Sequence, residues 1–207
     1  VFENSENQII YIPGANKFTS HIQVTSESLE TAKIVVSQME VNAEEVEQLF
    51  FNSRDKNCLN ILNLAPFKKP SKKLVAHTDV LVFNELEFSL FASLDTSSPV
   101  EVDILKEKLE NQNLSNKLAL IVTLGERGLV YYENNKMDYI EAEKVNAVDT
   151  VGSGDCFVGA LSYSLLNGKS LKDSCEFANK SAALSVTRKG AATSMPKIEE
   201  VRSFFKL

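Results

Sequence analysis

Hydrophobic residues along this chain follow two spacings, short continuous runs and stripes three to four residues apart. The continuous runs predict buried parallel strands at 34–37, 59–62, 80–83 and 118–123. A further run at 8–12 ends at Pro13 and predicts an edge strand. Segments 128–133 and 138–141 flank Asn134-Asn135 and predict a β-hairpin.

Apolar stripes predict helices between and after these strands. Asn42 precedes a stripe of Val46, Leu49 and Phe50, with Glu45 placed as the second member of a capping box. The later stripes are Phe157, Ala160, Leu161 and Leu165; Leu171, Cys175, Ala178 and Ala182; and Ile198, Val201 and Phe205. Asn167-Gly168 ends the first of these helices, Ser170 caps the second and Pro196 opens the third. The alternation predicts an α/β fold in one domain, with a largely parallel sheet.

Composition narrows the classes of function. With 207 residues, 43% of them hydrophobic, the chain has enough material for a sizeable core. Its net charge of −6 argues against a nucleic-acid surface, and a cluster of lysines at 68–73 predicts only a solvated loop and helix start. No apolar stretch approaches the length of a membrane span. The three cysteines, an odd number without metal-ligand spacing, favour a reduced, cytoplasmic setting.

Residues 149–155, Asp-Thr-Val-Gly-Ser-Gly-Asp, carry the most specific chemistry. An extended segment at 145–148 leads into this turn, and the apolar stripe after it predicts a helix that begins here. Gly152 and Gly154 permit positive φ and close approach of a ligand to the backbone. Backbone N–H groups at a helix start, next to Asp155, suit the binding of a phosphate and the deprotonation of a hydroxyl. The alternative is a plain glycine turn in which Asp155 is only a first-turn carboxylate.

Asp149 to Phe157 resembles the signature of the pfkB-type carbohydrate kinases, the family that includes ribokinase, fructokinase and adenosine kinase. Ser153 and Cys156 stand where alanine and threonine or serine are common in that family. Other family-like stretches follow in the expected order: 13–16, 38–40, 63–66, 84–87 and 123–128. Residues 186–191, Val-Thr-Arg-Lys-Gly-Ala, are similar to ribokinases in particular. The resemblance implies a ribokinase-like, doubly wound fold, with a mainly parallel sheet flanked by helices.

The same resemblance implies ATP-dependent phosphorylation of a sugar hydroxyl, D-ribose to D-ribose 5-phosphate. It covers residues 1–207 as the C-terminal two-thirds of such a domain, so we expect the N-terminal strands, the β lid and most sugar-binding groups to be missing, about 100 residues in all. Weak or absent turnover is then expected for this chain. The expected partners are a small sugar and ATP, with a homodimer weakened by the absent lid. The alternative is a non-catalytic nucleotide- or cation-binding remnant, or a pseudokinase that binds a partner.

The resemblance also implies roles for individual residues. Asp155 accepts the proton of the sugar hydroxyl and contacts the sugar, while the backbone N–H groups of Gly152, Ser153 and Gly154 hold the transferred phosphate. The nucleotide-binding positions are Asn84, Thr123, Gly125, Gly128, Gly154 and Asn179. Glu40 contacts sugar hydroxyls, and Glu87 acts on Mg²⁺ through water. The positions for a K⁺ ion, mostly through backbone carbonyls, are Asp149, Val151, Ser185, Arg188, Gly190 and Ser194.

Each of these roles has a purely structural alternative. Asn84 is equally suited to cap a helix that starts with acidic residues. Isolated glycines at 125 and 128 simply indicate a turn, and Asn179 also fits a helix–helix contact. Basic residues at 188–189 followed by Gly190 fit the end of a helix. Glu40 also fits a solvent-facing loop, and neither histidine receives a role.

Overall fold

The computed structural model describes residues 12–97, 99–110 and 117–206. Its six strands are β1 (Ile34–Ser37), β2 (Leu59–Asn63), β3 (Val80–Asn84), β4 (Ala119–Thr123), β5 (Leu129–Glu133) and β6 (Lys136–Ile140). They form one sheet in the order of the sequence; β1 to β4 are parallel to one another, and the pairs β4–β5 and β5–β6 are antiparallel. The predicted mainly parallel sheet and its hairpin are therefore confirmed. The predicted strand at 8–12 lies, except for Ile12, outside the described residues.

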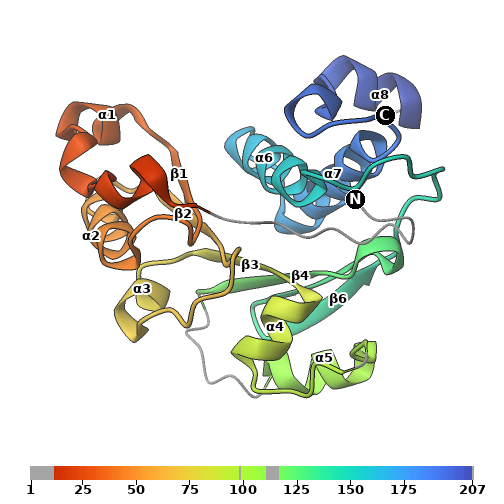
Figure 1. Cartoon of the computed structure of the whole chain (residues 1–207), viewed down its shortest axis with the longest axis horizontal. Helices are drawn as coiled ribbons and strands as arrows, with labels where there is room; N and C mark the ends of the chain where they lie inside the picture. The colour runs from red at the N-terminus through yellow and green to blue at the C-terminus, as the bar shows by residue number, and fades with distance from the viewer. Residues whose placement is uncertain (1–11, 98, 111–116, 207) are drawn as a thin grey trace.

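Helices cover both faces of this sheet (Figure 1). The α-helices are α1 (Ser26–Thr31), α2 (Ala43–Arg54), α3 (Lys72–Ala76), α4 (Glu85–Phe91), α5 (Val102–Glu110), α6 (Ser153–Leu166), α7 (Leu171–Ser185) and α8 (Ile198–Phe205). Short 3₁₀ turns are η1 (Gly14–Phe18), η2 (His21–Gln23), η3 (Gly125–Arg127) and η4 (Ala192–Ser194). In Figure 1, α2 to α5 lie on one side of the strands, and α6, α7 and α8 lie together on the other. None of the helices in the described ranges is long and apolar enough to cross a membrane.

The core divides into two layers because successive strand residues point to opposite faces. Leu81 and Phe83 of β3 belong to the cluster that includes Phe50 of α2 and Phe88 of α4. Val80 and Val82, which alternate with them along β3, belong to the second cluster. Phe157 and Leu161 of α6 and Cys175 and Ala178 of α7 belong to it as well. This explains the continuous apolar runs: the central strands are covered on both faces. The predicted core position of Cys175 is confirmed.

Glu45 does not form the predicted capping box. Asn42 caps α2 by accepting the Glu44 N–H, whereas Glu45 Oε2 lies against η2. There it accepts hydrogen bonds from the backbone N–H of His21 (2.8 Å) and from Ser20 Oγ (2.7 Å), and it contacts His21 Nδ1 at 2.7 Å. The His21 backbone N–H is the largest reason that the pKa of Glu45 falls to about 2. A tertiary partner thus replaces the local one.

Residues 145–148 lead into the glycine turn, as predicted, and belong to neither a helix nor a strand. Two element boundaries differ from the predictions. Helix α8 is capped by Lys197, so Pro196 precedes the helix and does not open it. Helix α7 ends at Ser185, with Val186 as its cap, so Gly190 has positive φ but is not the C-cap of α7. The segment at 188–190 is instead a loop of its own.

Candidate active site

The carboxyl ends of two central strands bring Asn84 and Thr123 together. Asn84 ends β3, Thr123 ends β4, and the two residues are partners in the parallel register. Thr123 Oγ1 donates a hydrogen bond to the carbonyl of Phe83 at 3.2 Å, which holds the ends of the two strands side by side. In open α/β sheets ligands bind beyond this edge, and the chain places a cavity there.

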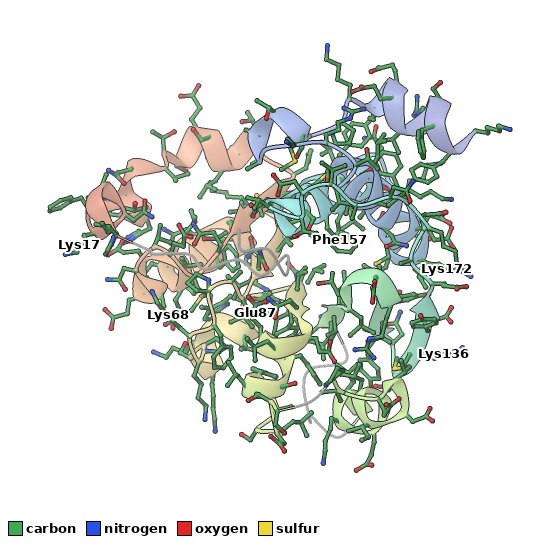
Figure 2. The ribbon with its side chains drawn as sticks, turned by 45° about the vertical axis from the view of Figure 1, so that its right-hand side comes forward. Lys17, Lys68, Glu87, Lys136, Phe157 and Lys172 are labelled. Atoms are coloured by element: carbon green, nitrogen blue, oxygen red, sulfur yellow. The ribbon has the colours of Figure 1, made fainter. Side chains whose placement is uncertain are left out.

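This cavity measures about 1070 Å³ and lies between the strand ends and the helices α6 and α7. All six predicted nucleotide-binding residues line it: Asn84, Thr123, Gly125, Gly128, Gly154 and Asn179. Ser153 and Phe157 of α6 also line it, and Figure 2 shows the labelled Phe157 and Glu87 inside the molecule, with the labelled lysines at its periphery. The structure therefore gathers residues 95 positions apart in the sequence, from Asn84 to Asn179, around one space. Their roles stay predictions.

Asn84 forms the N-cap of α4 together with Glu87. Asn84 Oδ1 accepts the Glu87 N–H at 2.8 Å, and Glu87 Oε2 accepts the Asn84 N–H at 2.7 Å. Burial raises the pKa of Glu87, and Glu87 is not among the residues that line the cavity, whereas Asn84 is. The capping role is therefore fully formed, and a role of Glu87 on Mg²⁺ would act through water.

The turn between β4 and β5 depends on a glycine. Gly128 has φ +98, and a Cβ added to it would lie 2.0 Å from the carbonyl oxygen of Ile140. The Leu124 N–H donates to the Gly128 carbonyl at 2.7 Å and closes the turn. Because Gly125 has φ +59 and no atom within 4 Å of an added Cβ, it leaves the backbone open toward the cavity.

Helix α6 begins at the glycine turn, as predicted. Gly152 is its N-cap in the left-handed region, φ +79, and an added Cβ would lie 3.1 Å from Met195 Cε. The first N–H groups of a helix have no partner within it. Here the N–H of Ser153, one of the predicted phosphate donors, already donates to the Thr150 carbonyl at 3.2 Å. An added Cβ at Gly154 would meet no atom within 4 Å, so this side of the helix end is open.

Asp155 occupies the first turn of α6 and is exposed. No hydrogen bond or ion pair joins its carboxylate to another side chain in the described parts of the chain. It lies beside the cavity-lining pair Ser153 and Gly154 and is not itself a wall residue. A free carboxylate next to a positive helix end can accept a proton from a bound hydroxyl.

Of the six residues predicted for K⁺, Asp149 and Val151 precede α6, Ser185 ends α7, and Arg188, Gly190 and Ser194 follow it, the last in η4. The segments before α6 and after α7 hydrogen-bond to each other. The Val148 and Asp149 N–H groups donate to the Val186 carbonyl at 2.7 and 3.1 Å. In return, Asp149 Oδ2 accepts the Gly190 N–H at 2.9 Å, and Oδ1 accepts the Val151 N–H at 3.1 Å. These two hydrogen bonds lower the pKa of Asp149, and the bond from the Gly190 N–H has the larger effect. The donor set is carboxylate and carbonyl oxygen, which fits a hard cation.

Some predicted residues are not brought into this cavity. Glu40 is exposed and does not lie on its wall. Asn179 lines it but also donates from Nδ2 to the Glu141 carbonyl at 2.9 Å, so its amide fixes the loop before the glycine turn. That loop, residues 141–147, supplies much of one wall. The sequence did not single it out because it has no periodicity and no glycine.

Comparison with known proteins identifies the family of this chain. The family model "pfkB family carbohydrate kinase" matches residues 1–198. A ribokinase of Schizosaccharomyces pombe is 35% identical over 212 residues, which cover 100% of this chain and 66% of that protein. The crystal structure of a Thermotoga maritima ribokinase, 29% identical, superposes with a TM-score of 0.84. The match covers 100% of this chain and 68% of that protein. The crystal structure of a Cryptococcus neoformans ribokinase in complex with ADP is 26% identical and has a TM-score of 0.83. The match covers 98% of this chain and 68% of that protein. The chain thus spans about two-thirds of the length of these proteins.

Proposed function

This chain belongs to the pfkB family of carbohydrate kinases, and we propose that the protein transfers the γ-phosphoryl group of ATP to a sugar hydroxyl, with D-ribose as the acceptor. One observation carries the proposal: a single cavity joins the carboxyl ends of β3 and β4 to the N-terminus of α6, where Asp155 is free. The ribokinases among its relatives support the choice of ribose.

In the proposed reaction Asp155 takes the proton of the attacking hydroxyl. The backbone N–H groups at the start of α6 face the transferred phosphoryl, and the positive end of the helix dipole stabilises its charge. Gly152 sets the direction of these groups through its left-handed φ, and Gly154 keeps the approach clear of a side chain. The chain therefore contributes position and charge stabilisation, which are the main sources of catalysis in phosphoryl transfer.

The rest of the cavity takes the nucleotide. Asn84 and Thr123, at the ends of β3 and β4, are proposed to lie near the phosphates, and Asn179 of α7 near the adenine ring; all three line the cavity. The relative solved with ADP supports a nucleotide here. A bound Mg²⁺ would neutralise phosphate charge, with Glu87 placed to act through water. Oxygens of the Asp149 and Gly190 loops would hold K⁺ beside the start of α6.

Asp155 and Glu40 are the residues proposed to contact the sugar. Glu40 is proposed as a sugar contact, yet it is exposed and lies off the cavity wall. The chain covers 66% of the length of the S. pombe ribokinase, so the activity, substrate and partners of the whole protein are proposals. A homodimer is proposed on the same footing.

A coupled ADP-release assay tests this function, run with ATP and D-ribose in potassium and then in sodium buffer on the natural protein that contains this sequence. For that protein we expect ADP release that requires ribose and is faster in potassium, and for residues 1–207 alone weak or absent release. Calorimetry with ADP runs in parallel. Nucleotide binding without sugar-dependent release would favour a non-catalytic nucleotide-binding protein, and no nucleotide binding at all would contradict the kinase assignment.

A further inference from the structure

Glu85, Arg127 and the backbone of Val100 form a closed ring of hydrogen bonds. Arg127 Nη2 donates to Glu85 Oε1 at 2.6 Å, and Arg127 Nη1 donates to the Val100 carbonyl at 3.1 Å. The Val100 N–H donates to the same Glu85 Oε1 at 2.5 Å. Each of the three groups therefore contacts the other two, although up to 42 positions separate them in the sequence. This ring is called the Glu85 ring below.

Each member of the Glu85 ring belongs to a segment that builds the cavity. Glu85 follows Asn84 directly and itself lines the cavity. Arg127 ends η3, between two lining glycines at 125 and 128. Val100 follows Pro99, which lines the cavity ahead of α5. The ring therefore fixes the distances between three separate parts of one wall.

The chemistry of the ring favours arginine at position 127. A guanidinium group has a planar fork of donors, so two separate nitrogens reach the carboxylate and the carbonyl, whereas the donors of a lysine all lie on one nitrogen. Exposed isolated ion pairs contribute little to stability. Here the side chains are about two-thirds buried or more, 34% exposed for Arg127 and 25% for Glu85, and a backbone N–H and carbonyl complete the ring.

Charge gives the ring a second effect. Four of the described side chains that line the cavity are carboxylates, at 85, 126, 141 and 143, while Lys144 is the basic one. Lys180 lies 3.8 Å from Glu143 and offsets that charge. An ATP molecule is itself strongly negative, so an unpaired Glu85 would repel it. Arg127 neutralises the carboxylate that adjoins Asn84.

We propose that Arg127 and Glu85 are positioning residues for the nucleotide: the Glu85 ring sets the Asn84 turn against the 125–128 turn, and Arg127 cancels the charge of Glu85. The inference rests on the proposed function. Neither side chain is needed at the proton transfer, so their loss weakens nucleotide binding in the ground state and the transition state alike. The KM for ATP should then rise, while kcat should stay nearly the same.

The test compares Arg127→Met, Glu85→Gln and the double variant in the natural protein that contains this sequence. For Arg127→Met we expect the KM for ATP and the calorimetric Kd for ADP to rise about tenfold, with kcat within about threefold and the KM for ribose unchanged. Glu85→Gln keeps an acceptor oxygen but loses the charge, so we expect a smaller rise in KM and Kd. The double variant binds ADP more tightly than Arg127→Met, because no unpaired carboxylate is left.

Lys56→Met is the matched control, since Lys56 is also 34% exposed and pairs with Glu30 at 2.7 Å away from the cavity. Circular dichroism checks folding, and Arg127→Lys replaces a variant that does not fold: it keeps the charge and loses the fork, so an intermediate Kd is expected. An unchanged Kd in Arg127→Met, or an equal loss in the control, would overturn the inference and leave the kinase function standing. A parent protein that binds no nucleotide would overturn both.

Discussion

The Asp149 carboxylate accepts the backbone N–H of Gly190 across 41 residues of chain, with Oδ2 and N 2.9 Å apart. The other oxygen of Asp149 accepts the Val151 N–H within the glycine turn. One side chain thus joins the turn that begins α6 to the loop that follows α7. The position of the backbone N–H groups that we assign to the phosphate depends on this connection.

Asp149→Ala should therefore impair catalysis more than folding. Without the carboxylate the turn loses its link to the Gly190 loop, and small displacements of catalytic groups cost up to about 10²-fold in rate. We expect a fall of that order in kcat and weaker activation by potassium. Steady-state kinetics over a potassium titration measure both. Asp149→Asn keeps one acceptor oxygen and should lie between; equal activity of all three proteins would contradict the assignment.

Gly152→Ala should destabilise the protein by about 1–2 kcal/mol, because φ +79 is unfavourable for a residue with a Cβ. Contact with Met195 Cε at 3.1 Å adds to this cost. Gly159→Ala is the matched control in the same helix: an added Cβ there meets no atom within 4 Å, and removing a glycine from a helix interior gains about 0.5–1 kcal/mol. Urea unfolding of both variants checks the opposite signs.

Glu87→Gln should separate capping from charge. Burial raises the pKa of Glu87 above its ordinary value of 4.5, so its contribution to stability is fully present below pH 4.5 and falls as the pH rises through the folded-state pKa. Glutamine still accepts the Asn84 N–H but carries no charge. Relative to the parent, the variant should therefore gain stability between acidic and neutral pH.

Glu87→Ala, which removes the capping box, should lose about 1 kcal/mol at neutral pH. Thermal unfolding from pH 4 to 8 measures all three proteins. A Gln variant whose stability follows the parent's at every pH would show that the carboxylate is not strained by burial. A strong loss of magnesium-dependent activity in the Gln variant would add support for its proposed role through water.

Much of the fold was predictable because the central strands are covered on both faces and are therefore continuously apolar. The side chains of Val80 to Phe83 point alternately into two core layers, so every residue of the run is hydrophobic. The glycine turn was predictable for a similar reason: Gly152 requires a backbone that other residues avoid. Such local constraints leave a pattern in the sequence.

Long-range pairs left no such pattern. Glu45 has the spacing of a capping box, but Ser20 and His21, 25 and 24 positions earlier, offer its carboxylate more donors. The partnership of Glu85 with Arg127 likewise depends on the sheet bringing two turns together. Sequence reasoning identified the turns and could not identify which charges meet between them.

Glu45→Gln should test that pair through pH. The folded-state pKa of Glu45 is about 2, below its ordinary 4.5, so its contribution is present above pH 4.5 and is lost as the pH falls toward 2. The variant should melt below the parent at pH 6 and approach it at pH 2. Glu44→Gln, an exposed neighbour on α2, serves as control. Parallel melting curves of Glu45→Gln and parent at every pH would refute the pairing.

Asp155, free beside the start of α6, is proposed to accept the proton of the sugar hydroxyl. The turnover of Asp155→Asn with ATP and D-ribose, measured together with its ADP affinity and melting temperature, tests this role. We expect a fall in kcat of about 10²–10⁴-fold, with ADP binding and melting temperature unchanged. Turnover equal to that of the parent protein would contradict it.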